Sequence, residues 1–249
     1  MNNINNGTLW IILFGITCVL IIYIRSQLSA PSLEAFIEKN NISLLNIQDL
    51  LDNANNGDLI FMCGDTHFER SCRWITGSVY SHVGLLFREK DPLTNDDILY
   101  IFDADMGQSY REGPRVMKLY DKLKRYHGYP YIMWRKLECN DEIGECNIPS
   151  TQQILDIVKH VKDYDFDNNM LTWFVSNNNF ICRTLYSLVK NHNKIFCSEL
   201  IAYTLQQLNI LNNDKKPSWY SPATFSKNII EGLQTNYKYS KPIYYKNTL

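Results

Sequence analysis

Residues 194–211 read KIFCSELIAYTLQQLNIL, and Cys197 stands near the beginning of this stretch. Apolar residues follow it at helical spacing, at Leu200, Ile201, Leu205 and Leu208. The spacing predicts a helix over 197–208 with Cys197 at its first turn. The N–H groups and the dipole of a helix N-terminus stabilise a thiolate and can also stabilise an oxyanion. The competing interpretation is a buried structural cysteine, the usual state of a free thiol.

Two further polar residues interrupt apolar strands upstream. His82 opens the strand-like run in YSHVGLLF (residues 80–87), and Asp103 ends the run in ILYIFDADMG (residues 98–107). Strand alternation places His82 on one face with Gly84, whose missing side chain leaves room beside the ring. A carboxylate at Asp103 could accept an imidazole N–H and fix its tautomer. Asp105, two residues on, competes for that role. Each residue also has a purely structural interpretation, a bonded core histidine or a turn acid.

The order of predicted elements indicates an α+β fold, because strands cluster in the middle of the chain and helices at its ends. Strands are expected at 58–63, 82–87, 98–103 and 131–137, and helices at 32–39, 46–51, 151–162, 181–189 and 197–208, with a last helix capped by Ser221. We divide the chain into residues 1–30, a domain over 31–232, and a tail over 233–249 that ends in an edge strand.

Composition excludes one large class of partner. The formal net charge is -1, with 25 Lys and Arg against 26 Asp and Glu, and the basic residues are spread along the chain. A nucleic-acid-binding protein needs a basic patch, so we expect no nucleic-acid partner. The 249 residues are 45% hydrophobic, enough for one sizeable core.

The N-terminal region predicts a membrane anchor. Residues 8–24 read TLWIILFGITCVLIIYI without a charge, a length at the short end of a bilayer span. A cleavable signal peptide fits less well, because no basic residue precedes the run and Leu28 and Ala30 make a poor cleavage site. Arg25 follows the run, so the positive-inside rule places the rest of the chain in the cytosol.

The chain contains seven cysteines with uneven spacing. A disulfide scaffold would normally pair all of its cysteines, so the odd number favours a reducing compartment. Cys139 and Cys146 flank an acidic loop and could pair only if that loop faced an oxidising lumen. Cys63, His67 and Cys72 could be zinc ligands, but without a CxxC spacing or a nearby fourth ligand we expect no metal there.

Taken together, these motifs resemble the circularly permuted NlpC-type branch of the papain-like superfamily, which includes the lecithin:retinol acyltransferase group and poxvirus members. The order His82, Asp103, Cys197 is that of the branch, Gly57-Asp58-Leu59 matches its strand entry, and residues 162–165 (KDYD) resemble an element found upstream of its cysteine. The resemblance covers roughly residues 46–225 and implies a central antiparallel sheet with packed helices. Bacterial hydrolases of the branch carry Glu where this chain has Asp103, and the acyltransferases use a second His that this chain lacks.

The resemblance implies a membrane-anchored thiol hydrolase with a Cys197–His82–Asp103 triad, acting on a small amide or ester without a cofactor. Two alternatives stay open. One is a lipid acyltransferase or phospholipase of the same fold, which the anchor favours. The other is a catalytically idle membrane or virion component of a large DNA virus.

The expected orientation gives a first prediction. Asn6-Gly7-Thr8 and Asn41-Ile42-Ser43 are glycosylation sequons on opposite sides of the expected anchor. In a eukaryotic cell that expresses the full chain, Asn41 should stay unmodified, because the cytosol lacks the glycosylation machinery. Glycosidase-sensitive mobility on a gel is the measurement, with Asn41→Gln as control. A glycan on Asn41 would reverse the orientation.

Overall fold

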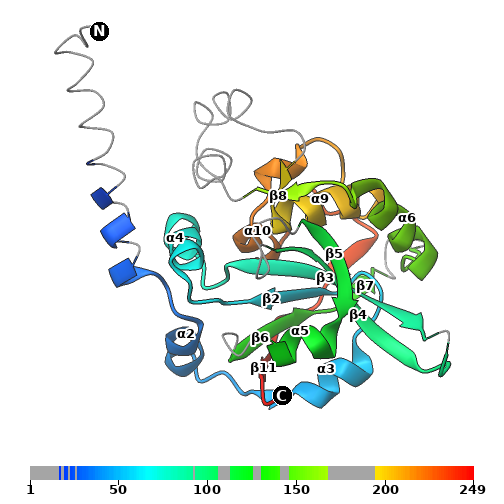
Figure 1. The fold of residues 1–249 in the computed structure, drawn as a ribbon, viewed down its shortest axis with the longest axis horizontal. Coiled ribbons are helices and arrows are strands. Elements are labelled where there is room, and N and C mark those ends of the chain that lie inside the picture. The colour runs from blue at the N-terminus through cyan, green and yellow to red at the C-terminus, as the bar shows by residue number, and fades with distance from the viewer. Residues whose placement is uncertain are drawn as a thin grey trace, which may run out of the picture.

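The computed structural model (Figure 1) describes residues 27–91, 93–105, 113–125, 130–140, 146–167 and 194–249, with Thr17, Leu20, Ile21 and residues 23–25. The fold is α+β, as predicted, with a large sheet and packed helices. The predicted helix over 181–189 and most of the predicted anchor over 8–24 lie outside these residues.

A seven-stranded sheet forms the centre, in the order β1-β11-β6-β2-β3-β4-β5. Neighbouring strands are antiparallel except for the pair β1 and β11. The sheet is therefore mixed, a small correction to the antiparallel sheet expected. The strands are β1 Leu45–Asn46, β2 Leu59–Met62, β3 His82–Lys90, β4 Asp97–Ala104, β5 Pro114–Lys118, β6 Tyr131–Arg135 and β11 Ile243–Lys246.

Helices cover both faces of this sheet (Figure 1). Alternation along β2 divides the core, since Leu59 and Phe61 pack with α9, whereas Ile60 and Met62 pack with α3 and α5. The helices are α2 Leu33–Lys39, α3 Ile47–Asn53, α4 His67–Thr76, α5 Leu119–Arg125, α6 Thr151–Val161, α9 Cys197–Gln207 and α10 Pro222–Ser226.

Local capping explains where several helices begin. The side chains of Ser32, Asn46, Ser150 and Ser221 each accept a hydrogen bond from a backbone N–H in the first turn of the helix that follows. The predicted ranges of α2 and α3 begin at their caps, that of α6 begins one residue after Ser150, and Ser221 is the cap that the sequence predicted for α10. The helices α4 and α5 and the strand β5 were not predicted, because they are short and their polar residues obscure the apolar period.

The C-terminal tail forms two strands, β10 Tyr237–Tyr239 and β11. β10 pairs with β7 Leu137–Cys139, and β11 lies between β6 and β1. The prediction of a strand is confirmed, but β11 is not at the edge of the sheet. Arg135 fixes the tail, because its buried guanidinium donates to the carbonyl oxygens of Tyr239 (3.2 Å) and Ser240 (2.9 Å).

The described N-terminal residues give the predicted anchor no support. Within the ranges given above, no helix is both long enough and apolar enough to span a bilayer. The end of this region contacts α4, because His67 Nδ1 lies 2.8 Å from Gln27 Oε1 and the ring of Tyr23 lies 5.9 Å from that of His67.

Cys139 and Cys146, whose pairing the sequence left open, form a disulfide. Disulfides persist mainly in oxidising compartments. The bond therefore favours the orientation opposite to the one that Arg25 indicates, and the exposed Asn41 sequon is where the two can be distinguished.

Asp58, in the Gly57-Asp58-Leu59 segment, joins β2 to β6 and β7. Its buried carboxylate accepts hydrogen bonds from Asn55 N (2.8 Å), Trp134 Nε1 (2.9 Å) and Leu137 N (2.8 Å). Burial raises its pKa to about 6, although these donors oppose the shift. The motif therefore has a structural reason in this chain, since one side chain accepts three hydrogen bonds, two of them from the buried residues Trp134 and Leu137.

Asp58→Ala should lower the free energy of unfolding by roughly 3 kcal/mol, because buried donors left without an acceptor are costly. The control is Asp52→Ala, at an exposed residue of α3, which should change stability by less than about 0.5 kcal/mol. Urea denaturation followed by circular dichroism measures both. Equal effects of the two substitutions would contradict this role for Asp58.

Candidate active site

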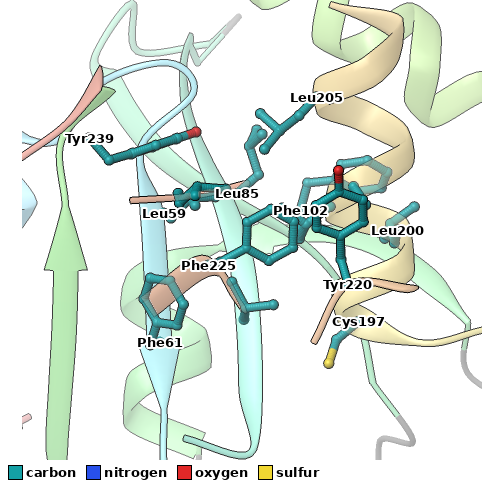
Figure 2. Close-up of a cluster of buried hydrophobic side chains, with 14 of the residues drawn as sticks. Leu59, Phe61, Leu85, Phe102, Cys197, Leu200, Leu205, Tyr220, Phe225 and Tyr239 are labelled. Atoms are coloured by element: carbon teal, nitrogen blue, oxygen red, sulfur yellow. The ribbon is translucent and has the colours of Figure 1, made fainter. Parts of the chain in front are cut away.

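Cys197 is the first residue of α9, as predicted. The preceding strand β9 Lys194–Ile195 pairs in parallel with β8 Asp165–Phe166, and Asp167 N donates to Ile195 O (3.2 Å). Residues of the predicted 162–165 element thus help to fix the chain that leads into Cys197. Figure 2 shows Cys197 at the start of the helix, with its sulfur directed away from Leu200 and Leu205.

Glu199, in the first turn of α9, has a structural role. Its carboxylate accepts a hydrogen bond from Phe196 N (3.5 Å), the residue that precedes the helix. The first N–H groups of α9, from Cys197 onwards, have no acceptor within the helix. They are therefore the groups that could stabilise an anion beside the sulfur.

His82 is the first residue of β3 and is 6% exposed. Its Nε2 lies 2.8 Å from Asp103 Oδ2. A carboxylate only accepts, so the ring donates its Nε2–H to Asp103. The other ring nitrogen, Nδ1, does not bond Asp103, and Cys197 lies close enough to His82 to act on the pKa of the ring. The structure thus brings together the three residues that the sequence proposed.

Gly84 allows the contact between His82 and Asp103. The register Leu85↔Phe102 places Gly84 opposite Asp103, so His82 reaches Asp103 along a diagonal between the strands. A Cβ on Gly84 would lie 2.6 Å from Ile101 Cδ1. The space that the sequence assigned to the imidazole is therefore filled by Ile101, and the glycine acts by letting β3 and β4 pack closely.

Two cations neutralise the carboxylates beside His82. Lys122 on α5 is fully buried and donates to Asp103 Oδ2 and to Asp105 Oδ2, the latter at 2.8 Å. Arg115 on β5 donates to Asp103 Oδ1 (3.3 Å) and Asp105 Oδ2 (2.7 Å). Asp103 is the acid that bonds the ring, whereas Asp105 bonds the two cations. The geometry thus favours Asp103 over Asp105 as the third member.

The charges in this cluster shift its pKa values strongly. Burial raises the pKa of Asp103 and of Asp105, but Lys122 and His82 outweigh it and lower both, that of Asp105 to about 2. Burial lowers the pKa of His82, yet the electrostatic influence of the nearby Cys197 and the hydrogen bond to Asp103 raise it to about 10. Lys122 opposes this rise. The protonated, imidazolium form of His82 is the state that these interactions favour.

Among the described residues, the same cluster also brings together side-chain atoms of the kind that can bind a metal ion. His82, Asp103 and Asp105 each place one such atom within 4.8 Å of the others. The ammonium of Lys122 already binds both carboxylates, so this set does not fit a cation well. Of the residues considered for zinc, Cys63 accepts from Arg73 Nη1 (2.6 Å) and His67 bonds to Gln27.

The sequence patterns did not identify Lys122 and Arg115 as residues of the site. Lys122 stands three residues after Leu119 and directly before Leu123, both buried against the sheet. A lysine on the apolar face of a short helix is the signal that could have found it, because such a lysine is rarely buried without an acidic partner. Arg115 lies directly opposite Asp103 in the β4–β5 register, which required a strand that the sequence did not indicate.

Comparison with known proteins does not identify the chain. No protein-family model matches it, and no curated protein does. Among solved structures it is similar to the "Crystal structure of metalloprotein yiiX from Escherichia coli O157:H7, DUF1105", with a TM-score of 0.41 and 14% identity over 75% of this chain and 96% of that one. A likeness at this level carries no argument about fold or function.

The site predicts a difference in thiol reactivity. Burial raises the pKa of Cys63 and Cys72, whereas Cys197 has the imidazole of His82 as partner. At pH 7 iodoacetamide, small enough for a thiol that is 6% exposed, should therefore alkylate Cys197 first. His82→Gln should slow that alkylation at least about tenfold.

Mass spectrometry of peptides from the alkylated protein measures the rate at each thiol. Cys63 serves as the internal control, and its rate should be the same in wild type and His82→Gln. Equal rates at Cys197 in the two proteins would show that His82 does not activate the thiol.

Proposed function

We propose that this protein is a thiol hydrolase that cleaves an amide or ester through an acyl-cysteine intermediate. The observation that supports it best is the placement of His82, which donates to Asp103 through Nε2 and lies close to Cys197. A nucleophile, a base and an orienting acid in contact are the arrangement that covalent acyl transfer needs. The α+β fold and the order of these residues agree with a permuted papain-like domain, which we propose as its fold family.

The chemistry follows from these contacts. His82 holds the proton of Cys197, and the thiolate sulfur adds to the carbonyl carbon while the C=O π electrons move to oxygen. The first N–H groups of α9 stabilise this oxyanion. The intermediate collapses, the leaving group departs with the proton from His82, and an acyl-thioester remains. Water then gives a proton to His82 and adds to the thioester, and the returning proton releases the acid and the thiol.

A catalytically idle protein explains these contacts less well. Two carboxylates, a lysine and a histidine buried together cost desolvation that an apolar core would avoid. A structural role requires neither a thiol at position 197 nor its contact with an imidazole. The cluster is therefore better explained by chemistry than by stability.

The triad predicts how the activity losses of single substitutions combine in a double variant. Cys197→Ala and His82→Ala should each remove nearly all activity, and the double variant should lose little more, because the residues act as a unit. Asp103→Asn should retain more activity than either, since the acid orients and does not react. Single-turnover acylation of the purified proteins is the measurement, with folding confirmed by circular dichroism.

Asp105→Asn is the matched control, because Asp105 belongs to the same cluster but does not bond the ring. Full acylation of a folded Cys197→Ala protein would contradict the mechanism. A loss in Asp105→Asn but none in Asp103→Asn would keep the Cys197–His82 pair and exchange the two acids.

A lipid substrate is the second candidate, favoured by the exposed apolar residues Leu20, Ile21, Ile24 and Leu28. The acylation experiment distinguishes it when soluble esters and amides are compared with phospholipid vesicles. With a soluble substrate, deletion of residues 1–30 should leave turnover nearly unchanged. Turnover of vesicles alone would favour acyl transfer or phospholipase action.

A further inference from the structure

Lys122 is a buried lysine that the proposed reaction does not use. Its ammonium and the Nε2–H of His82 both bond the same atom, Asp103 Oδ2. The apolar side of α5, with Leu119 and Leu123, packs on the sheet and carries Lys122 to this oxygen. An acceptor shared by two donors binds each of them less strongly than it would bind one alone.

The charges around His82 come from four elements. Asp103 lies on β4 and Asp105 directly follows it, Arg115 lies on β5, Lys122 on α5 and Cys197 on α9. Two carboxylates and two cations cancel, so the imidazole faces a neutral group on one side and the thiol on the other. Without Lys122 that group would carry one net negative charge beside the ring.

Such a charge would hold the proton on His82. The imidazolium must release its proton to the leaving group and must later, as a neutral ring, accept one from water. Beside carboxylates whose charge is not neutralised, the ring would be a poor acid in the first step. It would also seldom be in the neutral form that acts as the base in the second step.

We propose that Lys122 is a positioning residue that keeps the proton of His82 mobile, by sharing Asp103 Oδ2 and by cancelling the charge of Asp105. The role rests on the proposed function of His82 as acid and base. Lys122 contacts the two carboxylates and acts on the imidazole through them, so its effect is expected in the proton-transfer steps.

The test is the titration of His82 by NMR of its ring carbons and nitrogens. It uses the full chain in a Cys197→Ala background, which removes the thiolate that raises the pKa of the ring. The His82 signals are assigned by their loss in His82→Gln. Lys122→Met, which has a similar shape without the charge, should raise the pKa of His82 by about one or more.

Asp105→Asn should have the opposite effect and lower the pKa of His82, because it leaves the cluster with a net positive charge. The double variant Lys122→Met/Asp105→Asn restores neutrality, so its His82 should titrate near the background value. A merely structural lysine would give no such compensation, since two packing defects do not cancel.

Three outcomes would overturn the proposal: no rise in Lys122→Met, no fall in Asp105→Asn, or a double variant displaced as far as Lys122→Met. If Lys122→Met does not fold, Asp105→Asn still tests the sign. The titration needs no substrate, so it fails or succeeds independently of the acylation experiment. A failure to detect hydrolysis would count against the proposed function, but it would not contradict the proposed effect of Lys122 on His82.

Discussion

The hydrogen bond between His82 and Asp103 is the constraint on which the rest of the site depends. A carboxylate that is fully buried at the end of β4 is stable only where positive or donor groups surround it. The imidazole, Lys122 and Arg115 supply those groups from three different elements. The packing of α5, β5 and the start of β3 is therefore a requirement of one ionised side chain.

This constraint also explains why the two acids of the cluster are not equivalent. Asp103 faces the ring and both cations, whereas Asp105 bonds Lys122 and Arg115 and lies close to the ring without a bond to it. Removing either carboxylate alters the net charge by the same amount, but removing Asp103 also frees the imidazole to rotate. Asp103 thus orients the imidazole of His82, whereas Asp105 contributes only charge to the same cluster.

Sequence patterns predicted the parts of this arrangement that depend on local rules. The cap at Ser221 and the helical period after Cys197 are local features, and both predicted helices were found. Lys122 and Arg115 could not be predicted in the same way, because their partners lie 19 and 12 residues away and meet them only through strand register and helix packing. The Cys139–Cys146 bond was left open for a different reason, since spacing alone does not state the redox environment.

The alternation of side chains along β3 and β4 has a consequence for how the site can vary. His82 and Asp103 project toward the layer that contains α5, whereas Cys197 arrives with α9 from the opposite layer. The two groups can meet because His82 is the first residue of β3 and Cys197 the first residue of α9. A bulkier residue beneath α9 would displace the nucleophile alone, and one beneath α5 would displace the counterion alone. Sequence drift in the two layers should therefore leave different kinetic signatures, one in bond formation and the other in proton transfer.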